Sequence, residues 1–185
     1  MRKDLPITTA LFPMPVILIA TYNEDGSVDV MNAAWGCAYT YTQVFLNLDS
    51  AHKTFKNILR NKAFTIALAD AEHVAQADYV GMVSANNVKD KFEKSGLHAS
   101  QGLKVNAPVI EDFGLIMECE AVQVSAEDGV IGEIKRLAVD DKYIDENGRV
   151  DVAKLNIIAF DPLNRGYYVV NEKVGQAFSE GRRIK

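Results

Sequence analysis

Short runs of apolar residues, several of them alternating with polar residues, recur along most of the chain. Residues 16–22 are apolar and rich in β-branched side chains, and the Asp25-Gly26 pair that follows predicts a tight hairpin with residues 27–34. In residues 113–125, apolar side chains alternate with two glutamates, which is typical of a strand with one exposed face. Further strands are expected at residues 43–49, 63–68, 130–139, 156–160 and 167–170.

Helical spacing is clearest in one segment after the third expected strand. Ala51, Phe55, Ile58 and Leu59 fall on one face of a helix, and Ser50 before them is a suitable N-cap. Seven or more short strands with few helices predict a mainly β fold, an antiparallel barrel with peripheral helices. Loops are expected at residues 1–14 and 36–42, and shorter helices at residues 74–81, 89–94 and 172–179.

Composition narrows the class of protein. The 185 residues suffice for one domain, residues 1–185, and the net charge of −5 argues against nonspecific nucleic-acid binding. Cys37 and Cys119 do not have metal-ligand or disulfide spacing, so both are expected to be reduced thiols of a cytoplasmic protein, and Cys37 is interpreted as a buried structural thiol. The three scattered histidines match no metal pattern, and no metal site is expected.

One apolar segment could suggest a membrane or a targeting signal. Residues 11–20 are apolar, but they are too few to span a bilayer, and two prolines interrupt them. We therefore expect this segment to form a core strand and expect no membrane association.

The start of the expected central helix carries the first candidate site. A helix N-terminus has free N–H groups and the positive end of a dipole, and here Ser50, His52, Lys53 and Thr54 add further donors and charge. These residue types together suit a phosphate group. A capped amphipathic helix with solvated polar residues is the alternative.

Two other segments could take part in the same chemistry. In residues 31–35, Ala33 and Ala34 would let a flat ligand approach the backbone, and Asn32 offers both a donor and an acceptor. Residues 84–92 form a polar loop with two lysines that leads into a short helix. A small-residue strand end and an ordinary solvated loop are the respective alternatives.

The segments occur in an order that resembles the flavin reductase-like family with an FMN-binding split barrel, a group that includes flavoredoxins and archaeal ferric reductases. Similarity extends over residues 13–178. The matching motifs are PVILIAT with its Asp-Gly hairpin, VMNAAWG, HKTFKNI, VSANNVKDKFEKSGL, and APVIEDFGLIMECEA followed by GVIGEI.

The resemblance implies a Greek-key-like split barrel that holds FMN without a covalent bond. It implies that the isoalloxazine is lined by Asn32, Ala33, Ala34 and Trp35. It assigns the phosphate to Ser50, His52, Lys53, Thr54, Ser84, Asn86 and Lys91, with Ala85 in the same loop. The chain departs from the family at Ala85, where glycine is common, at Asp29, where asparagine is frequent, and at Tyr41-Thr42, which replace a proline pair.

The resemblance also implies a set of possible functions. Because the flavin would carry the hydride chemistry, no catalytic side chain is nominated. Three hypotheses stay open: an NAD(P)H-dependent oxidoreductase that reduces flavin, a ferric chelate or a redox partner protein; a flavoredoxin-like electron carrier; and a noncatalytic flavin-binding protein. A homodimer with FMN near the subunit interface is expected, and the single phosphate site favours FMN over FAD.

Overall fold

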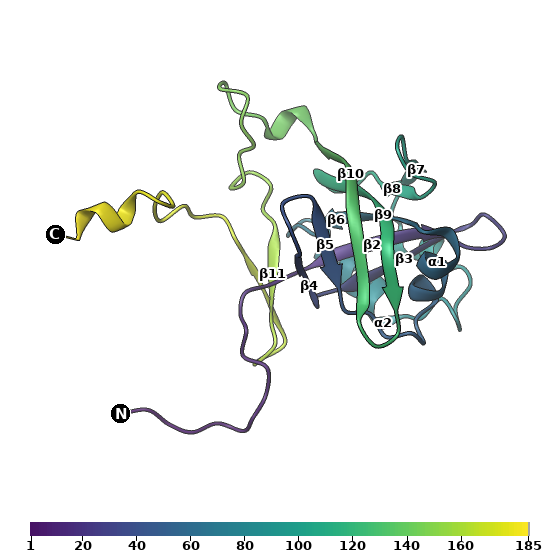
Figure 1. Cartoon of the computed structure of the whole chain (residues 1–185), viewed down its shortest axis with the longest axis horizontal. Coiled ribbons are helices and arrows are strands. Elements are labelled where there is room, and N and C mark those ends of the chain that lie inside the picture. The colour runs from purple at the N-terminus through teal and green to yellow at the C-terminus, as the bar shows by residue number, and fades with distance from the viewer. Residues whose placement is uncertain (185) are drawn as a thin grey trace.

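The computed structural model describes residues 1–184, and an antiparallel sheet curls through its centre as a half-barrel (Figure 1). From one edge to the other, the strands are β3 (Val28–Ala33), β2 (Ile17–Tyr22), β6 (Ala63–Leu68), β9 (Leu115–Ser125), β10 (Gly129–Val139), β5 (Gln43–Leu46) and β4 (Gly36–Ala38). Strands that are far apart in the sequence pair with each other: β6 lies between β2 and β9. The predicted mainly β split-barrel fold is confirmed.

The continuous apolar run in β2 is explained by burial of both faces of this strand. Leu18 and Ala20 pack into one core cluster, whereas Ile17 and Ile19, which point to the opposite face, pack into a second cluster. A strand covered on one face would need only every second residue to be apolar. The two clusters bury both faces of β2 and of its neighbour β6.

Helix α1 (Lys53–Asn61) starts later than predicted. His52, not Ser50, is the N-cap residue, because Asp49 Oδ1 accepts a 2.8 Å hydrogen bond from the Ala51 N–H and holds the preceding residues in a turn. Ala51 and Leu59, which the prediction placed on the apolar face with Phe55 and Ile58, are exposed. The buried face of α1 instead includes the polar residues Thr54 and Asn57, which hydrogen-bond to strand β3 and to the β2–β3 hairpin.

Several other boundaries differ from the prediction. The expected loop at residues 36–42 contains β4. The strand before α1 ends at Leu46 instead of residue 49, because its pairing with β4 and β10 stops there. Cys37, expected to be buried, is exposed on β4 at the sheet edge. Residues 172–179 do not form the expected helix, since no apolar face of this segment meets the barrel. The remaining elements are α2 (Val74–Met82), α3 (Lys91–Ser95), β7 (Ala99–Gln101), β8 (Pro108–Ile110), η1 (Asp141–Tyr143) and η2 (Glu180–Arg183), and the small sheet of β1 (Met14–Pro15), β11 (Ile158–Asp161) and β12 (Gly166–Val169).

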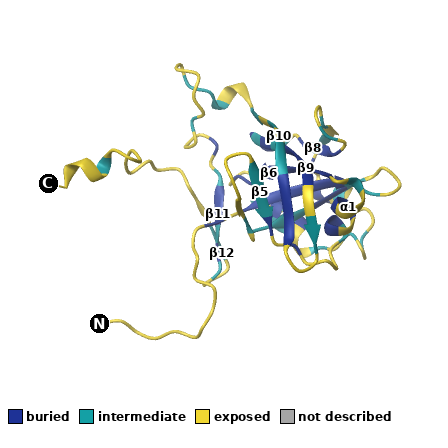
Figure 2. Ribbon diagram, viewed as in Figure 1, coloured by how far each residue is buried: buried dark blue, intermediate teal, exposed yellow. Residues whose placement is uncertain are grey.

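Both ends of the described chain leave the barrel on the same side and extend away from it (Figure 1). Figure 2 shows these arms as almost continuously exposed. Even so, they carry large apolar side chains, which are Leu5, Ile7, Leu11, Val174, Phe178 and Ile184. Among the helices of residues 1–184, none has the length and apolar character needed to span a bilayer.

Candidate functional site

A groove runs beside the edge strand β3, and two adjoining cavities form its central part. The cavity that we call the β3 cavity, of about 270 Å³, is lined by Val16, Asn32, Ala33, Ala34, Trp35, Asp78, Gly81, Met82, Phe160 and Tyr167. The lysine cavity, of about 200 Å³, is lined by Asp29, Met31, His52, Lys53, Thr54, Val80, Gly81, Met82, Val83, Ser84, Ala85 and Lys91. Because both share Gly81 and Met82, a single ligand can occupy them together.

The β3 cavity is bounded by backbone, small residues and aromatic rings. Asn32 Nδ2 donates a 3.0 Å hydrogen bond to the Ala77 carbonyl oxygen, which ties β3 to α2. A Cβ atom built on Gly81 would lie 3.1 Å from Asn32 Cβ, so the glycine permits this close approach of helix and strand. Trp35 is half exposed, with its ring 6.4 Å from that of Phe160. The cavity therefore offers a flat ligand both backbone and ring surfaces.

The lysine cavity contains a buried positive charge. Lys91, the first residue of α3, is only 4% exposed. No other described residue forms a hydrogen bond or ion pair with its ammonium group. Burial lowers the pKa of Lys91, and the negative charge of Asp29 partly opposes this effect. Because Lys91 lines the cavity and its ammonium group has no bonded partner among the described residues, this site is suited to receive an anion from outside the chain.

The side chain of Thr54 is held in position by a hydrogen bond to Asp29. Thr54 Oγ1 donates a 2.6 Å hydrogen bond to Asp29 Oδ2, and both side chains are buried. The Thr54 hydroxyl hydrogen is therefore already used inside the protein. What Thr54 can still offer an anion is its backbone N–H in the first turn of α1. Asp29 Oδ1 is buried and has no hydrogen-bond partner among residues 1–184.

The fold brings most of the predicted phosphate residues together. Those that line the lysine cavity are His52, Lys53, Thr54, Ser84, Ala85 and Lys91. Asn86 is displaced outward, where its Nδ2 donates a 3.0 Å hydrogen bond to the Ala51 carbonyl oxygen and fastens the 84–89 loop to the start of α1. Ser50 is exposed and lines neither cavity, since the helix begins three residues later.

Sequence reasoning missed the residues that close the other side of the β3 cavity. Tyr167 on β12 donates a 2.8 Å hydrogen bond from its hydroxyl to Asp78 Oδ1 on α2. Burial and Asp78 raise the pKa of Tyr167 to about 12, so the phenol stays protonated near neutral pH. Asp78 and Tyr167 are 89 positions apart, and no local pattern marks them as neighbours.

The groove continues beyond these cavities at both ends. An outer cavity of about 590 Å³ shares Lys53 and Ala85 with the lysine cavity and is also lined by Asn23, Glu24, Asp25, Ser27, Asn86 and Lys89. At the opposite end, a cavity of about 390 Å³ shares Trp35, Asp78, Phe160 and Tyr167 with the β3 cavity and reaches Thr8, Thr9, Pro162 and Arg165.

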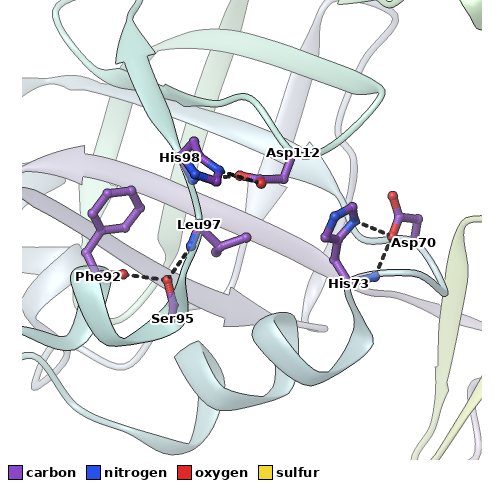
Figure 3. A network of polar contacts seen from close by, with 7 residues as sticks. All are labelled: Asp70, His73, Phe92, Ser95, Leu97, His98 and Asp112. Atoms are coloured by element: carbon purple, nitrogen blue, oxygen red, sulfur yellow. Dashed lines mark hydrogen bonds and ion pairs between the residues drawn. The ribbon is translucent and has the colours of Figure 1, made fainter.

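Figure 3 shows two histidine–aspartate pairs, none of whose residues lines a cavity of the groove. Asp70 Oδ1 accepts hydrogen bonds from the backbone N–H of His73 and pairs with its Nδ1 at 2.9 Å, which stabilises the start of α2. Asp112 binds the backbone and ring of His98 in the same way and raises its pKa. Within residues 1–184, no group of three or more His, Cys, Asp or Glu side chains is placed to bind a metal.

The curled antiparallel sheet places the protein in the split-barrel class. Residues 9–154 match the family described as flavin reductase like domain, and the chain therefore belongs to the flavin reductase-like family. The resemblance seen in the ordered motifs is confirmed.

Individual relatives agree with this assignment. The chain is similar to flavoredoxin of Desulfovibrio vulgaris (Miyazaki F), with 33% identity and a TM-score of 0.92 over 98% of this chain and 100% of the other. It shares its fold with flavoredoxin from Methanosarcina acetivorans, with 22% identity and a TM-score of 0.86 over the full length of both chains. An uncharacterized protein of Aeropyrum pernix is 31% identical over 134 residues, 69% of this chain, and the chain spans about half (51%) of that relative.

Proposed function

We propose that the groove binds FMN noncovalently, with the isoalloxazine in the β3 cavity and the phosphate in the lysine cavity. The observation that carries the proposal is Lys91, a buried cation without a bonded partner in the described chain, at the end of a slot bounded by backbone and aromatic rings. Phosphate would supply a hydrogen-bonded anionic partner for Lys91, so the residues present fit this cofactor.

Each part of the groove has a distinct task in this proposal. The ammonium groups of Lys91 and Lys53 and the first N–H groups of α1 neutralise the phosphate. His52, Ser84 and Ala85 line the cavity beside it. Asn32, Ala33, Ala34 and Trp35 hold the ring, and the Tyr167–Asp78 pair limits its movement on the far side. When bound, FMN supplies the electron-transfer chemistry.

FMN binding is tested by the visible absorption spectrum of the purified protein before and after addition of FMN, followed by gel filtration. The expected result is a flavin spectrum that stays with the protein peak. A colourless protein that loses all added FMN on the column would refute the proposal.

We further propose that the protein is an oxidoreductase that takes electrons from NADH or NADPH and delivers them to free flavin, a ferric chelate or a redox partner protein. Its support is membership of the flavin reductase-like family. Under anaerobic conditions, NADH or NADPH should bleach the FMN-loaded protein within minutes. A sample that bleaches with dithionite and stays yellow with both nicotinamides would contradict this activity.

A flavoredoxin-like electron carrier is the second candidate. It is favoured by the 33% identity to a flavoredoxin over nearly the whole chain. A carrier would bleach with dithionite but not with NADH or NADPH, and its reduced flavin would then pass electrons to cytochrome c. A noncatalytic flavin-binding protein would behave in the same way with dithionite and the nicotinamides, but its reduced flavin would not reduce cytochrome c.

We also propose a homodimer with FMN near the subunit interface. Its support is the set of exposed apolar side chains on the two arms, which a second copy would cover. Thr8 and Thr9 of the N-terminal arm line the cavity at one end of the groove together with Trp35. We also propose that the chain forms a single domain, which limited proteolysis tests. A cytoplasmic location is proposed as well, and cell fractionation tests it.

A further inference from the structure

One cavity lies at the end of the groove opposite the lysine cavity, and we call it the arginine cavity. It measures about 390 Å³, and the residues that it shares with the β3 cavity are Trp35, Asp78, Phe160 and Tyr167. Those that line the arginine cavity alone are Thr8, Thr9, Pro162 and Arg165. An isoalloxazine in the β3 cavity would therefore have the arginine cavity directly beside it.

Three aromatic rings line the arginine cavity. The ring of Phe160 lies 6.4 Å from that of Trp35 and 5.9 Å from that of Tyr167, measured between centroids. Trp35 is half exposed, so part of its ring is free to contact a ligand. Because aromatic rings pack well against other flat rings, this part of the cavity suits a planar aromatic group.

Arg165 brings a positive charge to the same cavity from the turn between β11 and β12. The buried carboxylate of Asp161 holds this turn, since it accepts hydrogen bonds from the Leu163 N–H at 2.8 Å and from Asn164 Nδ2 at 2.9 Å. The Arg165 guanidinium forms no hydrogen bond or ion pair with another residue of the described chain. It is therefore available to a carboxylate, which an arginine can bind through two parallel hydrogen bonds.

The two charges of the arginine cavity give a ligand one preferred orientation. Asp78 also lines the β3 cavity and accepts the 2.8 Å hydrogen bond from Tyr167, whereas Arg165 lines the arginine cavity alone. An acidic group would be repelled by Asp78 and attracted by Arg165. It would therefore point away from the β3 cavity and leave the ring of the ligand on the side of the isoalloxazine.

We propose that the arginine cavity binds a small planar aromatic carboxylate, with its ring against Trp35, Phe160 and Tyr167 and its carboxylate on Arg165. The neighbouring isoalloxazine is part of the proposed function, and to that extent the inference rests on it. The inference names the class of small molecule that the flavin ring would meet in the groove.

The experiment is a calorimetric titration of the FMN-loaded protein with benzoate and with benzamide, which has the same planar shape and no charge. Benzoate should bind roughly three- to tenfold more tightly than benzamide, as expected for one partly exposed charged contact. Arg165→Asn should abolish this preference and change the affinities for benzamide and FMN less than twofold. Arg165→Lys, which keeps the charge, should retain part of the preference.

The choice of asparagine separates loss of binding from damage to the fold. Arg165 has a backbone φ of 58°, in the left-handed region that asparagine adopts more readily than arginine. Arg165→Asn should therefore unfold at the same urea concentration as the wild-type protein or at a higher one. Arg149→Asn is the matched control, because Arg149 is exposed in another turn and lines no cavity of the groove.

Different failures point to different conclusions. If FMN does not bind, the proposed function is wrong, and the same titration of the flavin-free protein decides whether the arginine cavity takes an aromatic acid. If FMN binds but benzoate binds no more tightly than benzamide, or if Arg165→Asn and Arg149→Asn act alike, the arginine cavity is refuted as a carboxylate site while FMN binding stands. Mutual exclusion of benzoate and FMN would place benzoate in the β3 cavity and also overturn the proposal.

Discussion

Among the described residues, Lys91 is the only lysine that is buried, and the proposed cofactor site depends on it more than on any other side chain. In Lys91→Gln, FMN should bind about 1.5–3 kcal/mol more weakly, because a charged hydrogen bond to the phosphate is lost. Isothermal titration calorimetry checks this, with Lys56→Gln as the control.

Riboflavin separates this prediction from general damage to the groove. Riboflavin lacks the phosphate, so its affinity should be the same in Lys91→Gln and in the wild-type protein. A parallel loss of riboflavin and FMN binding would show that Lys91 supports the groove instead of contacting the phosphate.

The same lysine predicts a pH dependence. Burial lowers the pKa of Lys91 from its ordinary value of 10.5, so its positive charge is lost earlier than that of an exposed lysine as the pH rises. FMN affinity should therefore decline through the alkaline range below pH 10.5, measured by flavin fluorescence. In Lys91→Gln this decline should be absent, and an equal decline in both proteins would assign it to another group.

At the scale of elements, Glu118 joins the 102–107 loop to the two long strands of the barrel. This fully buried carboxylate accepts hydrogen bonds from the Lys104 N–H at 2.6 Å, the Val105 N–H at 3.1 Å and Arg136 Nη1 at 2.8 Å. Although burial raises the pKa of Glu118, the hydrogen bonds from Lys104 and Arg136 outweigh it and hold the pKa below its ordinary value. The ionised form is therefore the one that stabilises the fold.

Glu118→Gln should lower the free energy of unfolding by about 3 kcal/mol, because two interactions of the buried carboxylate are lost together, the ion pair with the partly exposed Arg136 and a hydrogen bond to a backbone N–H. Urea unfolding at neutral pH checks this value. Glu120→Gln is the matched control, since its exposed pair with Lys135 on the same two strands should contribute less than about 1 kcal/mol. In the wild-type protein, this stabilisation should disappear as the pH falls below 4.5 through the lowered pKa of Glu118, and equal effects of the two variants would contradict the assignment.

Elements were predicted well where one local pattern decided them, and poorly where a distant partner did. The β2–β3 and β9–β10 hairpins follow from apolar alternation and glycine turns. The start of α1 was placed too early, because the hydrogen bond from Ala51 to Asp49 competes with the cap at Ser50. The buried face of α1 was also misassigned, since its burial of Thr54 depends on Asp29, a residue of another strand.

At the scale of the whole molecule, the exposed apolar arms predict self-association. Light scattering coupled to gel filtration should give twice the mass of one chain. Replacing apolar arm residues by aspartate, as in the Ile7→Asp/Phe178→Asp double variant, should shift the protein toward the monomer, because buried charge at an interface is costly. Lys3→Asp, a charge change on the same arm, is the control. A wild-type protein that is monomeric at micromolar concentration would refute the dimer.

The sequence by itself determined the class of fold, the family, and the three segments that meet in the groove. Strand and turn patterns are local, and the ordered motifs carry the family resemblance. Only the tertiary structure decided that Lys91 is buried, that Ser50 lies outside the groove, and that Asp78 and Tyr167 close its far side. The tertiary structure also showed the outer cavity beyond the lysine cavity. The reason is physical: burial and cavity shape depend on contacts between residues far apart in the chain, which no local pattern encodes.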